Sequence, residues 1–103
     1  MMSDTIFQTL HIINKTSSHS DLYTDCFKTL LPGDAILLIE GAVYSACGQQ
    51  VCDLLKQQVP LYALNIDIQA RGLTQRIHSQ VISIDDDTFV SLTCQYKKSI
   101  SWF

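Results

Sequence analysis

The sequence predicts an α/β fold, a three-layer α/β/α sandwich built on a mostly parallel sheet of about five strands. The first observation is segment 34–41, in which an apolar run over 35–39 lies between Asp34 and Glu40, and Gly41 follows. A strand without polar alternation needs cover on both faces, which is usual for a parallel strand between helices. The second observation is that short apolar runs alternate with segments of helical spacing, a pattern typical of parallel sheets.

The first half of the chain supplies two strands and a helix. The run Thr9–Ile13 predicts the first strand, after a ragged lead-in over residues 1–8. We expect Ser20 to cap a helix that begins at Asp21, because its hydroxyl can accept a backbone N–H that has no partner within the helix. Apolar residues at helical spacing extend this helix to Pro32-Gly33, a turn signal that precedes the central strand.

The second half repeats the alternation. The expected elements are a short helix or loop over 42–47, a helix over 49–57, a strand over 61–64, a helical turn over 65–71, a strand over 81–84, a helix over 88–96 and a last strand over 100–103. Pro60 breaks the second helix, and Gly72 suits a left-handed helix cap. Asp85-Asp86-Asp87 resembles a metal or acid/base cluster, but acids before a helix usually cap it, and Lys97-Lys98 suit the negative end of the same helix.

Composition limits the function classes. A length of 103 residues indicates a single domain over 1–103, and 47% hydrophobic with 17% charged residues excludes disorder. The net charge of −3, with seven scattered Lys and Arg residues, disfavours direct nucleic-acid binding. We find no signal peptide, no membrane span and no glycine-rich phosphate loop, so we expect a cytoplasmic protein with no cofactor.

The four cysteines are dispersed and form no CxxC pair. No histidine stands near them at metal-ligand spacing, so we expect free thiols and no metal site. Cys47 lies near the carboxyl edge of the central strand, where ligands gather in open α/β sheets. Cys52 and Cys94 have the spacing of core or near-core residues. We interpret His11 as a hydrogen-bonded structural histidine in an apolar strand, and the other two histidines as loop residues.

Several stretches taken together resemble one known family. They are Leu10–Lys15, Gly33–Tyr44, Leu61–Leu73, Asp85–Thr93 and Trp102, and the most specific is YALNIDIQARGL at residues 62–73. Over nearly its whole length the chain resembles the TusB/DsrH family, small subunits of bacterial sulfur-relay complexes. The resemblance implies a DsrE/F/H-like α/β fold.

The resemblance also implies partners and a role. We expect assembly with TusC-like and TusD-like subunits into a dimer of heterotrimers that meets sulfur donor and acceptor proteins. The complex would pass persulfide sulfur toward 2-thiolation of the tRNA wobble uridine. Because the principal sulfur-accepting cysteine of this branch is on the TusD-like subunit, we expect this chain to be a supporting interaction subunit of a sulfurtransferase complex. A flavodoxin-like ligand-binding domain is a further possibility, resting on fold analogy alone.

The DsrH branch offers an alternative, because it carries a cysteine in the first helix, where this sequence has Cys26. Cys26 would then be a persulfide carrier in sulfur oxidation or transfer. A relay cysteine must be exposed and must have a lowered pKa to attack as a thiolate. Cys26 shares an apolar helix stripe with Leu22 and Leu30, which favours packing in the core over sulfur transfer.

Three further residues are candidates for a subunit interface. Arg71 can clamp a carboxylate of a partner or pair with Asp67 at the i, i+4 spacing, and the local pair is the simpler interpretation. Trp102 and Phe103 place two large rings at the end of the sequence, where they either anchor an interface or dock onto the core of their own chain.

Overall fold

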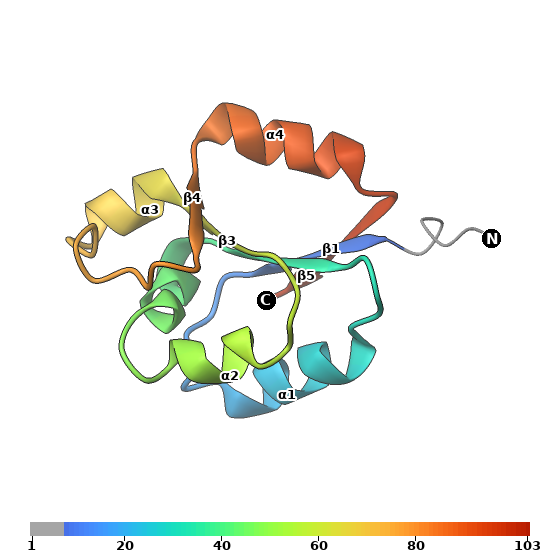
Figure 1. Ribbon diagram of the computed structural model, residues 1–103, viewed down its shortest axis with the longest axis horizontal. Coiled ribbons are helices and arrows are strands. Elements are labelled where there is room, and N and C mark those ends of the chain that lie inside the picture. The colour runs from blue at the N-terminus through green and yellow to red at the C-terminus, as the bar shows by residue number, and fades with distance from the viewer. Residues whose placement is uncertain (1–7) are drawn as a thin grey trace.

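The computed structural model describes residues 8–103 (Figure 1). Of the expected lead-in, residues 1–7 lie outside the described part. The elements within the described part are β1 (Thr9–Ile13), α1 (Ser20–Thr29), β2 (Ala35–Leu38), the 3₁₀ helix η2 (Glu40–Ala46), α2 (Val51–Leu55), β3 (Leu61–Leu64), α3 (Asn65–Ala70), β4 (Ile82–Ile84), α4 (Asp86–Gln95) and β5 (Lys98–Trp102). None of the helices in residues 8–103 is long and apolar enough to cross a membrane.

The five strands form one parallel sheet in the order β4-β3-β2-β1-β5. The predicted α/β class and the parallel sheet are confirmed. The central strand β2 is buried at all four positions, as its unbroken apolar run predicts. The two edge strands, β4 and β5, are instead largely exposed, and β5 pairs only with β1.

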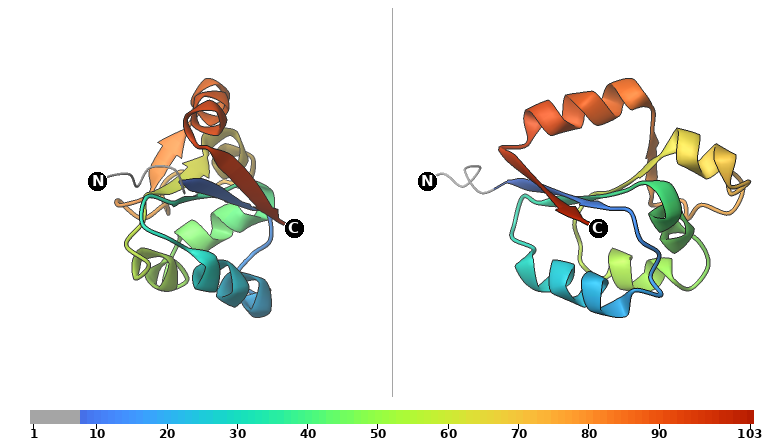
Figure 2. Two further views of the ribbon diagram at one scale, coloured as in Figure 1. Left: turned by 90° about the vertical axis from the view of Figure 1, so that its right-hand side faces the viewer. Right: turned by 180° about the vertical axis from the view of Figure 1, so that it is seen from behind.

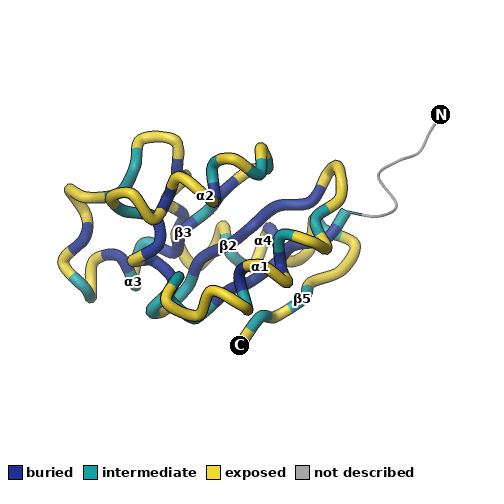
Figure 3. Tube along the Cα trace, turned by 90° about the horizontal axis from the view of Figure 1, so that it is seen from below, coloured by how far each residue is buried: buried dark blue, intermediate teal, exposed yellow. Residues whose placement is uncertain are grey.

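Helices cover both faces of the sheet. In Figures 1 and 2, α1 and α2 lie on one side of the sheet and α4 lies on the other. The first face packs a cluster that includes Ile13, Ile36 and Leu38, and the second packs a cluster that includes Leu10, Leu37 and Leu92. This arrangement follows from the alternation of side chains along the strands, which sends neighbouring residues to opposite faces. Figure 3 shows that burial is concentrated in the inner strands and that β5 is mostly exposed.

Several element boundaries differ from the sequence prediction. Helix α1 begins at Ser20 itself with His19 at the N-cap position, and no side chain caps it. It ends at Thr29, ahead of Pro32, because the residues that lead into a proline prefer extended backbone. Helix α2 is shorter than the expected 49–57, and Gln58 then turns the chain with φ 59°.

Helix α4 starts earlier than expected because Asp85 is its N-cap. The Asp85 carboxylate accepts a hydrogen bond from the Thr88 backbone N–H at 2.8 Å, so Asp86 and Asp87 form the first turn. The prediction that Lys97-Lys98 sit at the helix C-terminus is wrong, since the helix ends at Gln95 and Lys98 already belongs to β5. The prediction for Gly72 is confirmed: it has φ 67° and follows α3 as its left-handed cap.

Candidate functional site

Cys26 lies on α1 with its side chain turned toward the sheet. It has no exposed surface and belongs to the core cluster of the α1/α2 face. Burial raises the pKa of the Cys26 thiol from 9.0 to about 12, and the nearby Asp34 carboxylate adds to the rise. The thiol is therefore protonated at neutral pH in this conformation, which does not suit attack on a persulfide donor.

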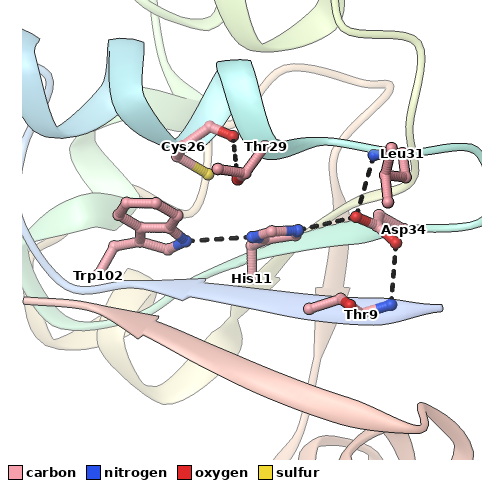
Figure 4. Close-up of polar contacts among 7 residues, drawn as sticks. All are labelled: Thr9, His11, Cys26, Thr29, Leu31, Asp34 and Trp102. Carbon is pink, nitrogen blue, oxygen red and sulfur yellow. Dashed lines mark hydrogen bonds and ion pairs between the residues drawn. The ribbon is translucent and has the colours of Figure 1, made fainter. Parts of the chain in front are cut away.

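A buried hydrogen-bonded chain lies directly beside Cys26 (Figure 4). The Trp102 Nε1–H donates to Nδ1 of His11 at 3.1 Å, and Nε2 of His11 lies 2.9 Å from Oδ2 of Asp34. His11 and Asp34 are each only 1% exposed. The three residues come from β5, from β1 and from the turn before β2, so we call them the Trp102–His11–Asp34 relay.

The partners of His11 fix its tautomer. A carboxylate only accepts hydrogen bonds, so Nε2 of His11 must donate to Asp34. An indole N–H only donates, so Nδ1 must accept from Trp102. The geometry therefore selects the neutral imidazole with its proton on Nε2. The interpretation of His11 as a hydrogen-bonded structural histidine agrees with these contacts.

Asp34 is the fixed end of the relay. Beyond His11, its carboxylate accepts the backbone N–H of Thr9 at 2.9 Å and that of Leu31 at 3.1 Å. Three donors thus compensate for the burial of its charge, as a buried carboxylate requires. Asp34 ties the start of β1 and the turn after α1 to β2, a role that sequence reasoning missed.

The two terminal aromatic residues have different environments. Trp102 is partly buried, packs against the core cluster and lies stacked on His11 with 6.2 Å between ring centroids. Phe103 is 63% exposed. The indole thus docks onto its own chain, whereas the Phe103 ring remains accessible to a partner. Their role in an interface stays a prediction.

Arg71 belongs to a polar network at the carboxyl ends of the strands. Its guanidinium lies 3.5 Å from Oδ1 of Asp67, the predicted i, i+4 pair. Asp67 also accepts the backbone N–H of Glu40 at 2.7 Å, and the Glu40 carboxylate accepts from Asn14 Nδ2 at 3.2 Å. These contacts hold Glu40 at φ 51°, an unusual conformation for a residue other than glycine. Arg71 remains 29% exposed, so an interface role for it also stays a prediction.

The remaining cysteines are less enclosed than Cys26. Cys47 is half-buried in a hollow of about 500 Å³, together with Tyr44 and Arg76. Burial raises its thiol pKa, and the Arg76 charge opposes that rise only in part. The prediction that Cys52 and Cys94 are core or near-core residues is wrong, because both are exposed on the outer sides of their helices.

In residues 8–103, no three His, Cys, Asp or Glu side chains gather as metal ligands would. Asp85, Asp86 and Asp87, considered above as a possible metal or acid/base cluster, instead form the N-cap and first turn of α4. The notable chemical group of the chain is therefore a buried thiol beside the Trp102–His11–Asp34 relay.

The chain is an open α/β domain, and its fold matches that of a solved structure. The crystal structure of ychN protein from E. coli matches with a TM-score of 0.66, covering 91% of this chain and 97% of that one at 15% identity, which shows a shared fold.

Sequence comparison identifies the family, which the shared fold alone does not. A model of the DsrH-like protein family matches residues 15–99. Protein TusB of Pectobacterium carotovorum subsp. carotovorum strain PC1 is 36% identical over 95 residues, covering 90% of this chain and 99% of that protein. Protein TusB of Escherichia coli O81 is 35% identical over 95 residues, with the same shares of both chains covered. The chain belongs to the TusB/DsrH family, which confirms the predicted resemblance and places it among sulfur-relay subunits.

Proposed function

We propose that this chain is a supporting interaction subunit of a cytoplasmic sulfur-relay complex, one that passes persulfide sulfur toward 2-thiolation of the tRNA wobble uridine. The observation that carries the proposal is the match to TusB proteins over nearly the whole chain, combined with complete burial of Cys26. A subunit that shapes a docking surface needs no accessible thiol of its own. In this role the chain binds TusC-like and TusD-like subunits in a dimer of heterotrimers.

The proposed interface uses residues that the isolated chain leaves accessible. Phe103 supplies an exposed aromatic ring of the kind that anchors interfaces, and the exposed part of Trp102 continues that surface. Arg71 supplies a cation at the carboxyl edge of the sheet, where a partner carboxylate can share it with Asp67.

Co-expression with a TusC-like and a TusD-like subunit from one organism tests the assembly. We expect an affinity tag on this chain to retain both partners, and Phe103→Ala to weaken retention at least tenfold. The control is Val90→Ala, which removes a similarly exposed apolar side chain (61%) on α4. Equal retention by wild type and both variants would remove Phe103 from the interface. Failure of the wild-type chain to retain either partner would contradict the assembly itself.

A second candidate function is persulfide transfer through Cys26, as in the DsrH-like alternative. The observation that favours it is the position of the thiol beside His11, whose ring nitrogen can serve as a base once free. Replacing Cys26 by Ser in the assembled complex separates the two functions. Unchanged sulfur flux to the acceptor supports the interaction subunit, and loss of flux in a complex that still assembles supports the carrier.

A further inference from the structure

The Trp102–His11–Asp34 relay joins an exposed edge strand to two almost fully buried polar side chains, those of His11 and Asp34. Strand β5 pairs on one side only, with β1, and its Lys98, Ser99 and Ser101 side chains are exposed. Its apolar side chains, Ile100 and Trp102, are only partly buried. The indole N–H of Trp102 is the side-chain donor that connects this strand to the core.

Figure 4 shows how the Trp102 indole lies relative to the Cys26 thiol. The Cys26 sulfur points from α1 toward the rings of Trp102 and His11, and Trp102 packs against the cluster that contains Cys26. His11 is fixed from its other side, because Asp34 holds Nε2 and is itself held by Leu31. Of the residues drawn around the thiol in Figure 4, Trp102 comes from the edge strand β5, which pairs on one side only and is largely exposed.

We propose that β5 is a latch: the Trp102–His11 hydrogen bond holds the indole over the Cys26 thiol, and release of Trp102 opens a path to that thiol while the rest of the domain stays folded. In the closed state the thiol is shielded and Nδ1 of His11 is occupied. In the open state Nδ1 is a free acceptor beside an accessible thiol, with Asp34 still orienting the ring. The latch goes beyond the proposed function, because it concerns access to Cys26 whether or not sulfur passes through it.

Local opening of this kind is expected at an edge strand such as β5, which pairs on one side only and exposes most of its side chains. Segments of low local stability open without global unfolding, and their opening equilibrium can be read from the rate at which a hidden group reacts. Trp102→Phe keeps an aromatic ring at this position but removes the N–H that donates to His11. Removing one hydrogen bond of ordinary strength raises the open population about fivefold.

The experiment is alkylation of the folded chain by iodoacetamide, with the modified cysteines located by peptide mass mapping. We expect Cys26 to react about fivefold faster in Trp102→Phe than in wild type, because loss of one hydrogen bond raises the open population by that factor. The exposed Cys52 is the internal control, and its rate should be equal in both proteins. Phe103→Leu is the matched neighbouring variant, because Phe103 takes no part in the relay, and it should leave the Cys26 rate unchanged. Equal Cys26 rates in wild type and Trp102→Phe would overturn the latch.

Global unfolding would also expose Cys26, so its contribution is measured separately. Leu92→Ala destabilises the opposite face of the sheet without touching the relay. The latch predicts little change of the Cys26 rate in Leu92→Ala and only a weak dependence of the wild-type rate on urea. A Cys26 rate that rises in Leu92→Ala as much as in Trp102→Phe, or that follows urea as steeply as global unfolding, would overturn it.

Discussion

Replacing Asp34 by Asn tests the buried relay at its fixed end. The side chain is 1% exposed and accepts three hydrogen bonds: from Thr9 N, from His11 Nε2 and from Leu31 N. Asn has nearly the same shape but one acceptor oxygen instead of two, and its NH₂ group only donates. Whichever way the amide turns, its NH₂ group faces at least one of these donors.

The magnitude follows from the contacts that are lost. With the amide oxygen toward His11 and Leu31, its NH₂ group faces the Thr9 backbone N–H, and the other two bonds lose their charged acceptor. Hydrogen bonds to charged groups contribute about 1.5–3 kcal/mol each, so Asp34→Asn should lower the free energy of unfolding by about 2–4 kcal/mol. Asp34→Ala, which leaves no acceptor, should lower it by about 3–5 kcal/mol.

Urea unfolding followed by circular dichroism measures these values, and thermal unfolding should show a drop of about 10–20 °C for Asp34→Asn. The control is Asp53→Asn, because the Asp53 carboxylate is 78% exposed and makes only a surface pair with Lys56 at 3.7 Å. That variant should remain within about 0.5 kcal/mol of wild type. A value for Asp34→Asn equally close to wild type would refute the account of the relay.

Three other perturbations follow from the same structure. Tyr23→Phe removes the hydroxyl that donates to Lys15 O at 2.7 Å and contacts Ser45 Oγ at 2.9 Å, so urea unfolding should show a loss of about 1–2 kcal/mol. The folded pKa of Cys26 is raised above its unfolded value, so the folded state binds more protons than the unfolded state above about pH 9. The Cys26 thiol should therefore lower the free energy of unfolding by about 1 kcal/mol between pH 8 and pH 10. Cys26→Ala should lose this decrease of stability with pH, and Cys52→Ala should keep it. Hydrogen bonding from Thr88 lowers the pKa of Asp85 in the folded state. The stability from the Asp85 cap is therefore present above the unfolded pKa and is lost as pH falls through the folded pKa. Wild type should melt at a higher temperature than Asp85→Ala near pH 7, and this difference should vanish in strong acid.

The strands were the most predictable part of the fold. Thr9–Ile13 and Leu61–Leu64 begin and end where the apolar runs indicated, because burial between two helix layers requires unbroken apolar sequence. Helix ends were less predictable, since they depend on which side chain reaches which N–H: Asp85 caps α4, whereas Ser20 does not cap α1. Cys52 shows a related limit, because spacing along a short helix does not reveal which side the sheet covers.

The relay could not be assembled from the sequence alone. Trp102 and His11 lie 91 positions apart, and only the placement of β5 beside β1 brings them together. The local signals were present: a histidine inside an apolar strand and an acid at the start of the central run. Periodicity indicates that such groups are buried, but it does not identify their partners, which tertiary packing decides.

The most direct test of the proposed role is the mass of every subunit after the assembled complex is incubated with a persulfide donor. If this chain is a supporting subunit, one sulfur, about 32 Da and reversible by reductant, is gained on a partner subunit and none on this chain. A reversible gain that peptide mapping places on Cys26 would contradict the supporting role and make this chain a sulfur carrier.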